Sequence, residues 1–259
     1  MAVSNDEQSI VHQLVAMSRA LGDPECDYVI LGEGNTSARV DDDRMYVKAS
    51  GVSLCGIAED GFVGVRRGKV IEMLDAGDLT DAQVAQGLRE AMVDAALPRR
   101  PSVETLLHAY LLGLEGVNFI GHTHPTAVNA VLCSKEGKEA IGGRIYPDEI
   151  VVCGVAPVFV DYVDPGVPLA RAVREHTQRY IEEYGCRPQS ILLQNHGLIA
   201  LGATATQVEA ITATWVKTAR IIIGATAFGG PRFLSRENVA RIYTRPDEHY
   251  RRRGLTGDK

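Results

Sequence analysis

The sequence Gly121-His122-Thr123-His124-Pro125 follows the apolar run Gly116 to Ile120, and a second histidine motif, Asn195-His196-Gly197, comes later in the chain. In a β-strand, residues two apart point to the same face, so His122 and His124 can bind one ion. Three protein ligands on a zinc ion leave one coordination position open for water or substrate. The pattern therefore predicts a catalytic divalent-metal site at the end of a buried strand.

The alternative for any one of these histidines is a structural role. A lone histidine on an apolar strand is more often a core residue with satisfied hydrogen bonds than a metal ligand. His122, His124 and His196, however, each lie where a hydrophobic strand meets a turn. Folds of the α/β class collect functional side chains at such junctions, so the three together favour the metal site.

Glu104 and His108 lie four residues apart in a predicted helix from Ser102 to Leu114. The helix dipole favours a carboxylate in the first turn, which explains Glu104 without any catalytic role. A carboxylate beside three imidazoles can also bind the metal at rest and remove a proton from a carbon next to a metal-bound carbonyl. His108 shares the helix face of Glu104; it either holds Glu104 or a ligand in place or is a polar core residue.

Composition narrows the class of protein. The chain has 259 residues, 45% hydrophobic and 23% charged, and we expect a single domain over residues 1–259 with a C-terminal tail from about residue 230. A formal net charge of −6 argues against nucleic-acid binding. No apolar stretch reaches a membrane-spanning length and no secretory pattern opens the chain, so we expect a cytoplasmic protein without membrane contact. The five cysteines are scattered, and we expect them reduced.

Hydrophobic periodicity predicts alternating helices and strands, and hence a mixed sheet flanked by helices. The predicted helices cover residues 6–21, 80 or 81 to 96, 102–114, a segment after Pro125, 169–184 and 205–225. The predicted strands cover residues 38–47, 62–65, 117–121, 150–153, 157–160, 191–193 and 198–201.

Two turns rich in small residues, Gly32 to Ser37 and Lys48-Ala49-Ser50-Gly51, are candidate anion-binding loops. Backbone N–H groups in such turns can form an anion-binding nest, and Lys48 adds a cation. By composition alone these are ordinary turns. The first is followed by a strand, whereas the glycine-rich loop of a dinucleotide site is followed by a helix, so the sequence does not favour a nucleotide cofactor.

Taken together, five motifs resemble the class II aldolase/adducin family in the same order, over about Ile10 to Gly224. They are Gly34-Asn35-Thr36-Ser37, Lys48-Ala49-Ser50-Gly51, Pro101-Ser102-Val103-Glu104 with His108, His122-Thr123-His124-Pro125 and Asn195-His196-Gly197. The family includes L-fuculose-1-phosphate aldolase, L-rhamnulose-1-phosphate aldolase and L-ribulose-5-phosphate 4-epimerase. The histidine motifs are the most specific part of the resemblance.

The resemblance implies the fold class α/β, as a three-layer α/β/α sandwich with a largely antiparallel central sheet. It also implies a homotetramer with active sites between subunits and a bound Zn²⁺, with Mn²⁺, Co²⁺ or Fe²⁺ as chemically reasonable substitutes. By resemblance the metal ligands are His122, His124, His196 and Glu104, and Glu104 is also the catalytic base that carries the proton.

The resemblance further implies a phosphate site formed by Asn35, Ser50, Gly51 and Ser102, and Lys48 is similar to a residue of the rhamnulose-type enzymes. The chain departs from the fuculose type at Val103, where those aldolases carry a second serine that contacts phosphate. The resemblance also calls for an acid tyrosine contributed by a neighbouring subunit. Tyr162 is the best match for it, and the alternative for Tyr162 is a buried structural role.

The expected activity is therefore that of a zinc-dependent aldehyde-lyase. It would cleave a ketose 1-phosphate to dihydroxyacetone phosphate and an aldehyde through an enediolate. The alternatives are a decarboxylase or sugar-phosphate 4-epimerase with the same metal site, and an adducin-like interaction module without chemistry. The stretch Arg245 to Tyr250 is expected to cover a neighbour's active site. The basic residues Arg245, Arg251, Arg252 and Arg253 fit a solvated tail or a subunit contact, and the alternative is a contact with a substrate phosphate.

Overall fold

A seven-stranded sheet organises the computed structural model, which describes residues 5 to 248, and its strand order is β3-β2-β1-β4-β7-β6-β5. Every neighbouring pair is antiparallel except β5 and β6, which are parallel. The strands are β1 (Asn35–Arg39), β2 (Arg44–Lys48), β3 (Phe62–Arg66), β4 (Phe119–Thr123), β5 (Val158–Val160), β6 (Ser190–Leu193) and β7 (Gly197–Gly202).

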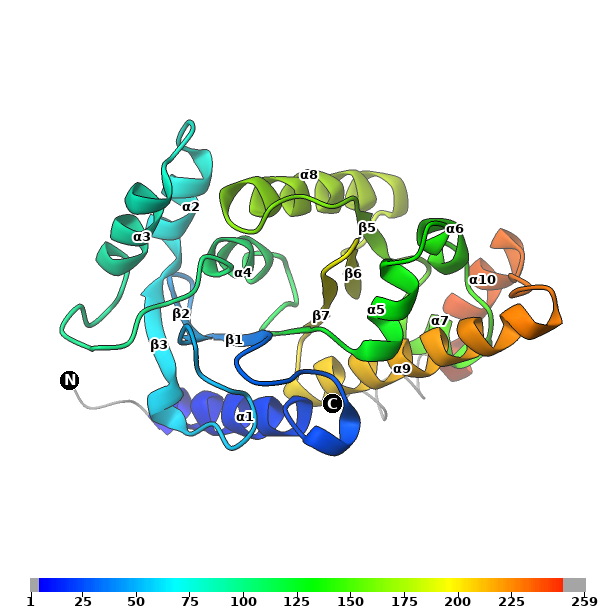
Figure 1. Ribbon diagram of the computed structural model, residues 1–259, viewed down its shortest axis with the longest axis horizontal. Coiled ribbons are helices and arrows are strands. Elements are labelled where there is room, and N and C mark those ends of the chain that lie inside the picture. The colour runs from blue at the N-terminus through cyan, green and yellow to red at the C-terminus, as the bar shows by residue number, and fades with distance from the viewer. Residues whose placement is uncertain (1–4, 249–259) are drawn as a thin grey trace.

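Helices cover both faces of this sheet (Figure 1). On one face lie α1 (Asn5–Leu21) and α9 (Ala205–Ala225), which pack against β1, β4 and β7. On the other lie α2 (Arg67–Asp75), α4 (Thr105–Leu111) and α8 (Val167–Tyr184). The peripheral elements are α3 (Asp81–Glu90), α5 (Thr126–Leu132), α6 (Gly137–Ile141), α7 (Pro147–Cys153), α10 (Arg236–Tyr243) and the 3₁₀ turns η1 (Pro24–Cys26), η2 (Glu59–Gly61) and η3 (Thr226–Phe228).

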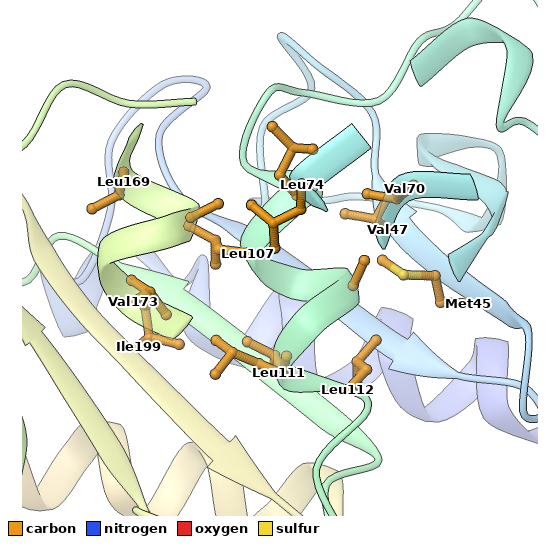
Figure 2. Close-up of a cluster of buried hydrophobic side chains, with 14 of the residues drawn as sticks. Met45, Val47, Val70, Leu74, Leu107, Leu111, Leu112, Leu169, Val173 and Ile199 are labelled. Carbon is orange, nitrogen blue, oxygen red and sulfur yellow. The ribbon is translucent and has the colours of Figure 1, made fainter. Parts of the chain in front are cut away.

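The sheet separates two hydrophobic clusters. Figure 2 shows the first, in which Leu107 and Leu111 of α4 pack between α8 and the β2 side chains Met45 and Val47. The second lies under α1 and α9 and contains the fully buried Trp215. Because both faces are covered, all five residues of β4 are buried, and the strand carrying the first histidine motif reads as an apolar run.

The predicted three-layer fold and its mainly antiparallel sheet are confirmed. The helix predicted over residues 205–225 has those bounds, and α1 matches the helix predicted over residues 6–21. The strand predicted over residues 117–121 is β4 at residues 119–123. His122 therefore lies inside the strand and His124 one residue beyond its end.

The strand predicted over residues 150–153 is wrong, because this segment is the helix α7. A short apolar run does not distinguish a buried strand from a helix buried on all sides, and α7 is enclosed by α9 and α10. Proline at its start and Gly154 at its end, with φ of 77°, bound it as a helix.

Other predicted elements differ in extent. The helix predicted to reach residue 96 ends at Glu90, because Met92 pairs in an isolated bridge with Val65 at the sheet edge. The helix predicted over residues 102–114 is regular only over Thr105–Leu111. The strand predicted over residues 38–47 is two strands joined by a turn, and three helices, α2, α6 and α10, were not predicted.

Two observations concern the environment of the protein. Within residues 5 to 248, no helix combines the length and the apolar character needed to span a membrane. All five cysteines are free in the structure. The cytoplasmic location and the single-domain organisation stay predictions.

Candidate metal centre

The histidine motifs meet because β4 and β7 are antiparallel neighbours, with His122 opposite Ile199 and Thr123 opposite Leu198. His196 lies in the tight turn between β6 and β7, next to Asn195, whose φ is 54°. Asparagine tolerates this left-handed conformation better than most residues. The chain thereby turns back within a few residues, and the imidazole of His196 reaches the end of β4.

The three imidazoles converge through their Nε2 atoms. The Nε2 atom of His122 lies 3.1 Å from that of His124 and 3.2 Å from that of His196. The Nδ1 atom of His122 lies 3.0 Å from the carbonyl oxygen of Leu198, to which it donates a hydrogen bond. In the neutral ring the Nε2 atom of His122 therefore carries the lone pair, directed at the other two rings, as in a metal-binding histidine.

Glu104 joins the cluster from the residue that caps α4. Its Oε1 atom lies 3.4 Å from Nε2 of His122 and 3.2 Å from Nε2 of His196, and only 14% of its side chain is exposed. Its other oxygen, Oε2, accepts a hydrogen bond from the side-chain amide of Asn35. The carboxylate thus faces two of the three imidazoles with one oxygen and is held by the other.

The charges of these groups are coupled. Burial alone would raise the pKa of Glu104, but the imidazoles of His122 and His196 outweigh it and hold that pKa well below its usual range. Burial would lower the pKa of His122, and the nearby Glu104 carboxylate raises it instead. Burial and the neighbouring imidazoles lower the pKa of His124 to about 3. The site is thus built around one anionic carboxylate.

The donor atoms fit a divalent metal ion. Zinc–nitrogen bonds of about 2.0–2.1 Å in a tetrahedral site place two ligand nitrogens roughly 3.3 Å apart. The Nε2–Nε2 separations of 3.1 and 3.2 Å are close to that edge length, and the ligand atoms of the three histidines all lie within 4.8 Å of one another. Imidazole and carboxylate donors suit zinc first and also accommodate other first-row divalent ions. His122, His124, His196 and Glu104 would hold the ion.

His108 does not touch the cluster directly. It is fully buried, with Nδ1 2.7 Å from the Ser37 hydroxyl and Nε2 hydrogen-bonded to Oδ1 of Asn35. Burial lowers the pKa of His108 to about 3, so it is neutral at physiological pH. Of the two roles that the sequence left open for His108, the placement favours holding Glu104, through the intervening amide of Asn35.

Lys48 ties together the two loops proposed from the sequence. The residue is almost fully buried, and its Nζ atom donates to the carbonyl oxygens of Gly32, at 3.2 Å, and Val52, at 2.5 Å. Burial lowers the pKa of Lys48, partly offset by the negative charge of Glu104. A β-carbon added to Gly32 would meet Gly51 at 3.6 Å, so the two loops touch.

The remaining predicted phosphate residues lie around the second loop. The backbone N–H of Ser50 donates to the carbonyl of Arg100 at 2.9 Å, which joins this loop to the segment before Glu104. Gly51 adopts a φ of 77° with no atom near the position of a β-carbon. The hydroxyl of Ser102 is buried with no hydrogen-bond partner, so an acceptor or donor from a ligand would satisfy it.

Two cavities adjoin these groups. One, of about 470 Å³, includes Ser50 and Val103 in its lining together with the side chains of Arg89 and Arg100. The other, of about 400 Å³, opens on the ring of His124. Its lining includes Glu33, whose Oε2 lies 3.9 Å from Nδ1 of His124. The sequence interpretation missed Glu33, although it is the one charged residue within the small-residue turn that precedes Asn35.

Tyr162 lies at the surface beyond β5, with 56% of the residue exposed. Its hydroxyl donates to Asp164 at 3.0 Å, a contact that raises the pKa of Tyr162. The alternative of a buried structural tyrosine is therefore wrong. The contribution of Tyr162 to a neighbouring subunit's active site stays a prediction.

The predicted C-terminal cover, Arg245 to Tyr250, lies partly outside the described residues. Arg245 pairs with Asp247 at the surface, and His249 to Tyr250 and the basic residues Arg251 to Arg253 lie beyond residue 248. Their expected contact with a neighbouring subunit is untested.

Residues 12–223 match the family described as Class II Aldolase and Adducin N-terminal domain, and the chain belongs to that family. The uncharacterized oxidoreductase YuxG of Bacillus subtilis (strain 168) is 28% identical over 238 residues, a match that covers 86% of this chain and 32% of YuxG. The chain thus spans about a third of the length of that relative.

Solved structures share the fold. The N-terminal class II aldolase domain of a conserved protein from Thermoplasma acidophilum has 25% identity and a TM-score of 0.64, covering 86% of this chain and 95% of that one. The L-fuculose 1-phosphate aldolase from Glaciozyma antarctica PI12 has 15% identity and a TM-score of 0.63, and the match covers 100% of this chain and 94% of that one. At that identity the second likeness concerns the fold alone. These structural matches agree with the family membership that the family model shows. They concern the fold and not the substrate.

Proposed function

We propose that the protein is a zinc-dependent aldolase that cleaves a ketose 1-phosphate to dihydroxyacetone phosphate and an aldehyde. The observation that carries the proposal is the convergence of the His122, His124 and His196 Nε2 atoms with the Glu104 carboxylate. When bound there, a divalent ion supplies Lewis-acid polarisation of the substrate carbonyl, so that charge developing on its oxygen is stabilised.

Glu104 is the proposed proton carrier. Its Oε1 faces the imidazoles while Oε2 is held by Asn35, so a substrate that reaches the site meets an anionic base at a fixed position. In the cleavage direction the proton of the substrate hydroxyl passes to the Glu104 carboxylate and the adjacent carbon–carbon bond breaks. The protonated Glu104 then returns that proton to the carbon left with the electron pair. Tyr162 of a neighbouring subunit would exchange the proton at the aldehyde oxygen in a homotetramer, and its exposed position supports that role.

The cavity beside Ser50 supports a phosphorylated substrate. Arg89 and Arg100 line it, the unpartnered hydroxyl of Ser102 lies in the adjoining segment, and phosphate oxygens are strong acceptors for guanidinium groups. Val103, also in the lining, stands where the fuculose-type aldolases have a serine. We infer that the arginines compensate for that missing hydroxyl.

The test uses purified, metal-quantified protein with ketose 1-phosphates and their unphosphorylated counterparts, with and without a chelator. We expect chelator-sensitive release of dihydroxyacetone phosphate. Release of carbon dioxide or pyruvate would replace the aldolase by a decarboxylase or another lyase, and a sugar phosphate inverted at one carbon would indicate the 4-epimerase. Metal-free protein without activity on the panel would favour an interaction module, although the full ligand set argues against it.

Substitution of the arginines tests the phosphate contact separately. Arg100→Ala is expected to raise KM for the phosphorylated ketose by about tenfold or more, since a hydrogen bond to a charged group contributes about 1.5–3 kcal/mol. KM for the unphosphorylated counterpart should not change. Arg99→Ala is the matched control, because Arg99 pairs with Asp60 at the surface and does not line the cavity. Equal effects of the two variants would refute the phosphate contact.

A further inference from the structure

A chain of side-chain hydrogen bonds runs from β1 into the candidate metal centre. The Ser37 hydroxyl contacts Nδ1 of His108 at 2.7 Å, Nε2 of His108 contacts Oδ1 of Asn35, and Nδ2 of Asn35 donates to Oε2 of Glu104. Ser37 and His108 are fully buried and Asn35 is 4% exposed. The chain therefore lies away from solvent along its whole length.

The secondary structure brings these four residues into line. Asn35 and Ser37 are two apart on one strand and so point to the same face of the sheet. Glu104 and His108 are four apart, at the cap and within α4, and so share a helix face. The spacing along the strand and the helix thus places the polar side chains of Asn35 and Ser37 opposite those of Glu104 and His108.

The chemistry of the groups fixes the direction of every hydrogen bond. An ionised carboxylate only accepts, so Asn35 presents its NH₂ group to Glu104 and its carbonyl oxygen to His108. The Nε2 atom of His108 must then carry the proton, and Nδ1 accepts from the Ser37 hydroxyl. Without a donor at residue 108, the carbonyl oxygen of Asn35 would lose its partner, and the amide would be held only by its hydrogen bond to Glu104.

We propose that Asn35, His108 and Ser37 are positioning residues that orient the Glu104 carboxylate toward the metal centre. Each polar atom of the Asn35 amide makes a hydrogen bond within the protein, and Nδ2 keeps a second hydrogen, so this role is compatible with the phosphate contact predicted from the resemblance. The inference rests on the proposed metal site and is independent of the substrate. His108 acts on Glu104 only through Asn35.

Co²⁺ is the probe, because its visible absorption reports the number and type of its ligands. His108→Ala should weaken Co²⁺ binding by about 10- to 100-fold, the usual effect of losing a group that orients a ligand. Its spectrum should shift toward that of Glu104→Gln, in which the carboxylate is absent. His108→Gln should restore both properties, because its amide can donate to Asn35 in place of the imidazole.

A matched control separates orientation from stability. Thr36 is the buried residue between Asn35 and Ser37, and its hydroxyl bonds Ser18 at 2.6 Å on the α1 side of β1. Thr36→Val should lower the free energy of unfolding and leave the Co²⁺ spectrum unchanged. Should His108→Ala not fold, Ser37→Ala removes only the terminal hydroxyl and should shift the spectrum in the same direction by a smaller amount.

The outcomes distinguish this inference from the proposed function. An unchanged spectrum and Co²⁺ affinity in His108→Ala, or in Ser37→Ala where the first variant does not fold, would overturn the positioning role, as would equal changes in Thr36→Val. Failure of the wild-type protein to bind Co²⁺ would overturn the metal site itself. The expected spectral changes with no cleavage of any ketose would leave the positioning role standing while the aldolase assignment falls.

Discussion

Replacing Gly197 by alanine is expected to weaken metal binding by pushing on two ligand rings. Gly197 begins β7, one residue after His196. A β-carbon at this position would lie 2.5 Å from the backbone oxygen of Thr123 and 2.8 Å from Cδ2 of His124. It would also lie 3.4 Å from Cε1 of His122.

The size of the effect follows from these distances. Ordinary van der Waals contact begins near 3.4 Å, so the ring of His124 would have to move by roughly 0.6 Å, beyond the tolerance of about 0.2 Å for metal–ligand distances. The clash with the Thr123 oxygen involves backbone of the paired strand and is not relieved by rotating a side chain. We expect zinc affinity to fall by about 10- to 100-fold and the free energy of unfolding by about 1–3 kcal/mol.

The assay is zinc competition with a fluorescent chelator, combined with urea unfolding of the metal-free protein. Gly121→Ala is the matched control, because its β-carbon would meet the flexible ends of Val208 and Leu21, at 2.7 and 2.8 Å, within the core. It should lose stability and keep most of its zinc affinity. Wild-type zinc affinity in Gly197→Ala would refute the reasoning that these rings form the metal site.

Three further predictions concern charge. At saturating metal, Glu104→Gln should still hold the ion through the three histidines, with lower affinity, and should lower turnover by at least ~100-fold if Glu104 carries the proton; near-normal turnover would exclude that role. The pKa of His108, about 3 against an ordinary 6.5, means that the folded protein binds this proton less readily than the unfolded chain. The stabilisation from the buried, neutral His108 side chain is therefore fully present above pH 6.5 and is lost as the pH falls toward 3. Over that range the free energy of unfolding decreases by up to about 1.4 kcal/mol per pH unit. Urea unfolding of the metal-free protein at pH 7 and pH 5 should show a smaller difference in His108→Gln than in wild type; equal differences would contradict the assignment. Glu149→Gln should cost about 3–5 kcal/mol, because Arg144, bonded to Glu149 at 2.8 Å, is buried, while zinc affinity should not change. A loss below 1 kcal/mol in urea unfolding would contradict that estimate.

Much of the fold could be predicted from periodicity. The bounds of α9 were predictable because its apolar positions recur at helical spacing, and Thr204 caps the first turn by accepting from the Gln207 N–H. The segment 150–153 was mistaken for a strand because all four of its residues are buried, and such a run shows no amphipathic pattern. α2 was missed because no capping side chain marks its start directly after β3.

The candidate site shows the same division. The metal-binding residue types and the turns that carry them are visible along the chain, so His122, His124, His196 and Glu104 could all be proposed without coordinates. The position of Glu33 near His124 could not be predicted from the sequence, because it depends on how the turn before β1 folds against the end of β4.

The sequence by itself determined the chemistry of this protein: three imidazoles at strand ends, one carboxylate at a helix start and the order of motifs that defines the family. Only the tertiary structure decided how those groups are used. That the Asn35 amide faces Glu104 depends on the packing of α4 against β1, which places His108 opposite Asn35. Hydrogen bonds of this kind join residues about 70 positions apart, so their geometry is set by packing across the sheet and not by local sequence.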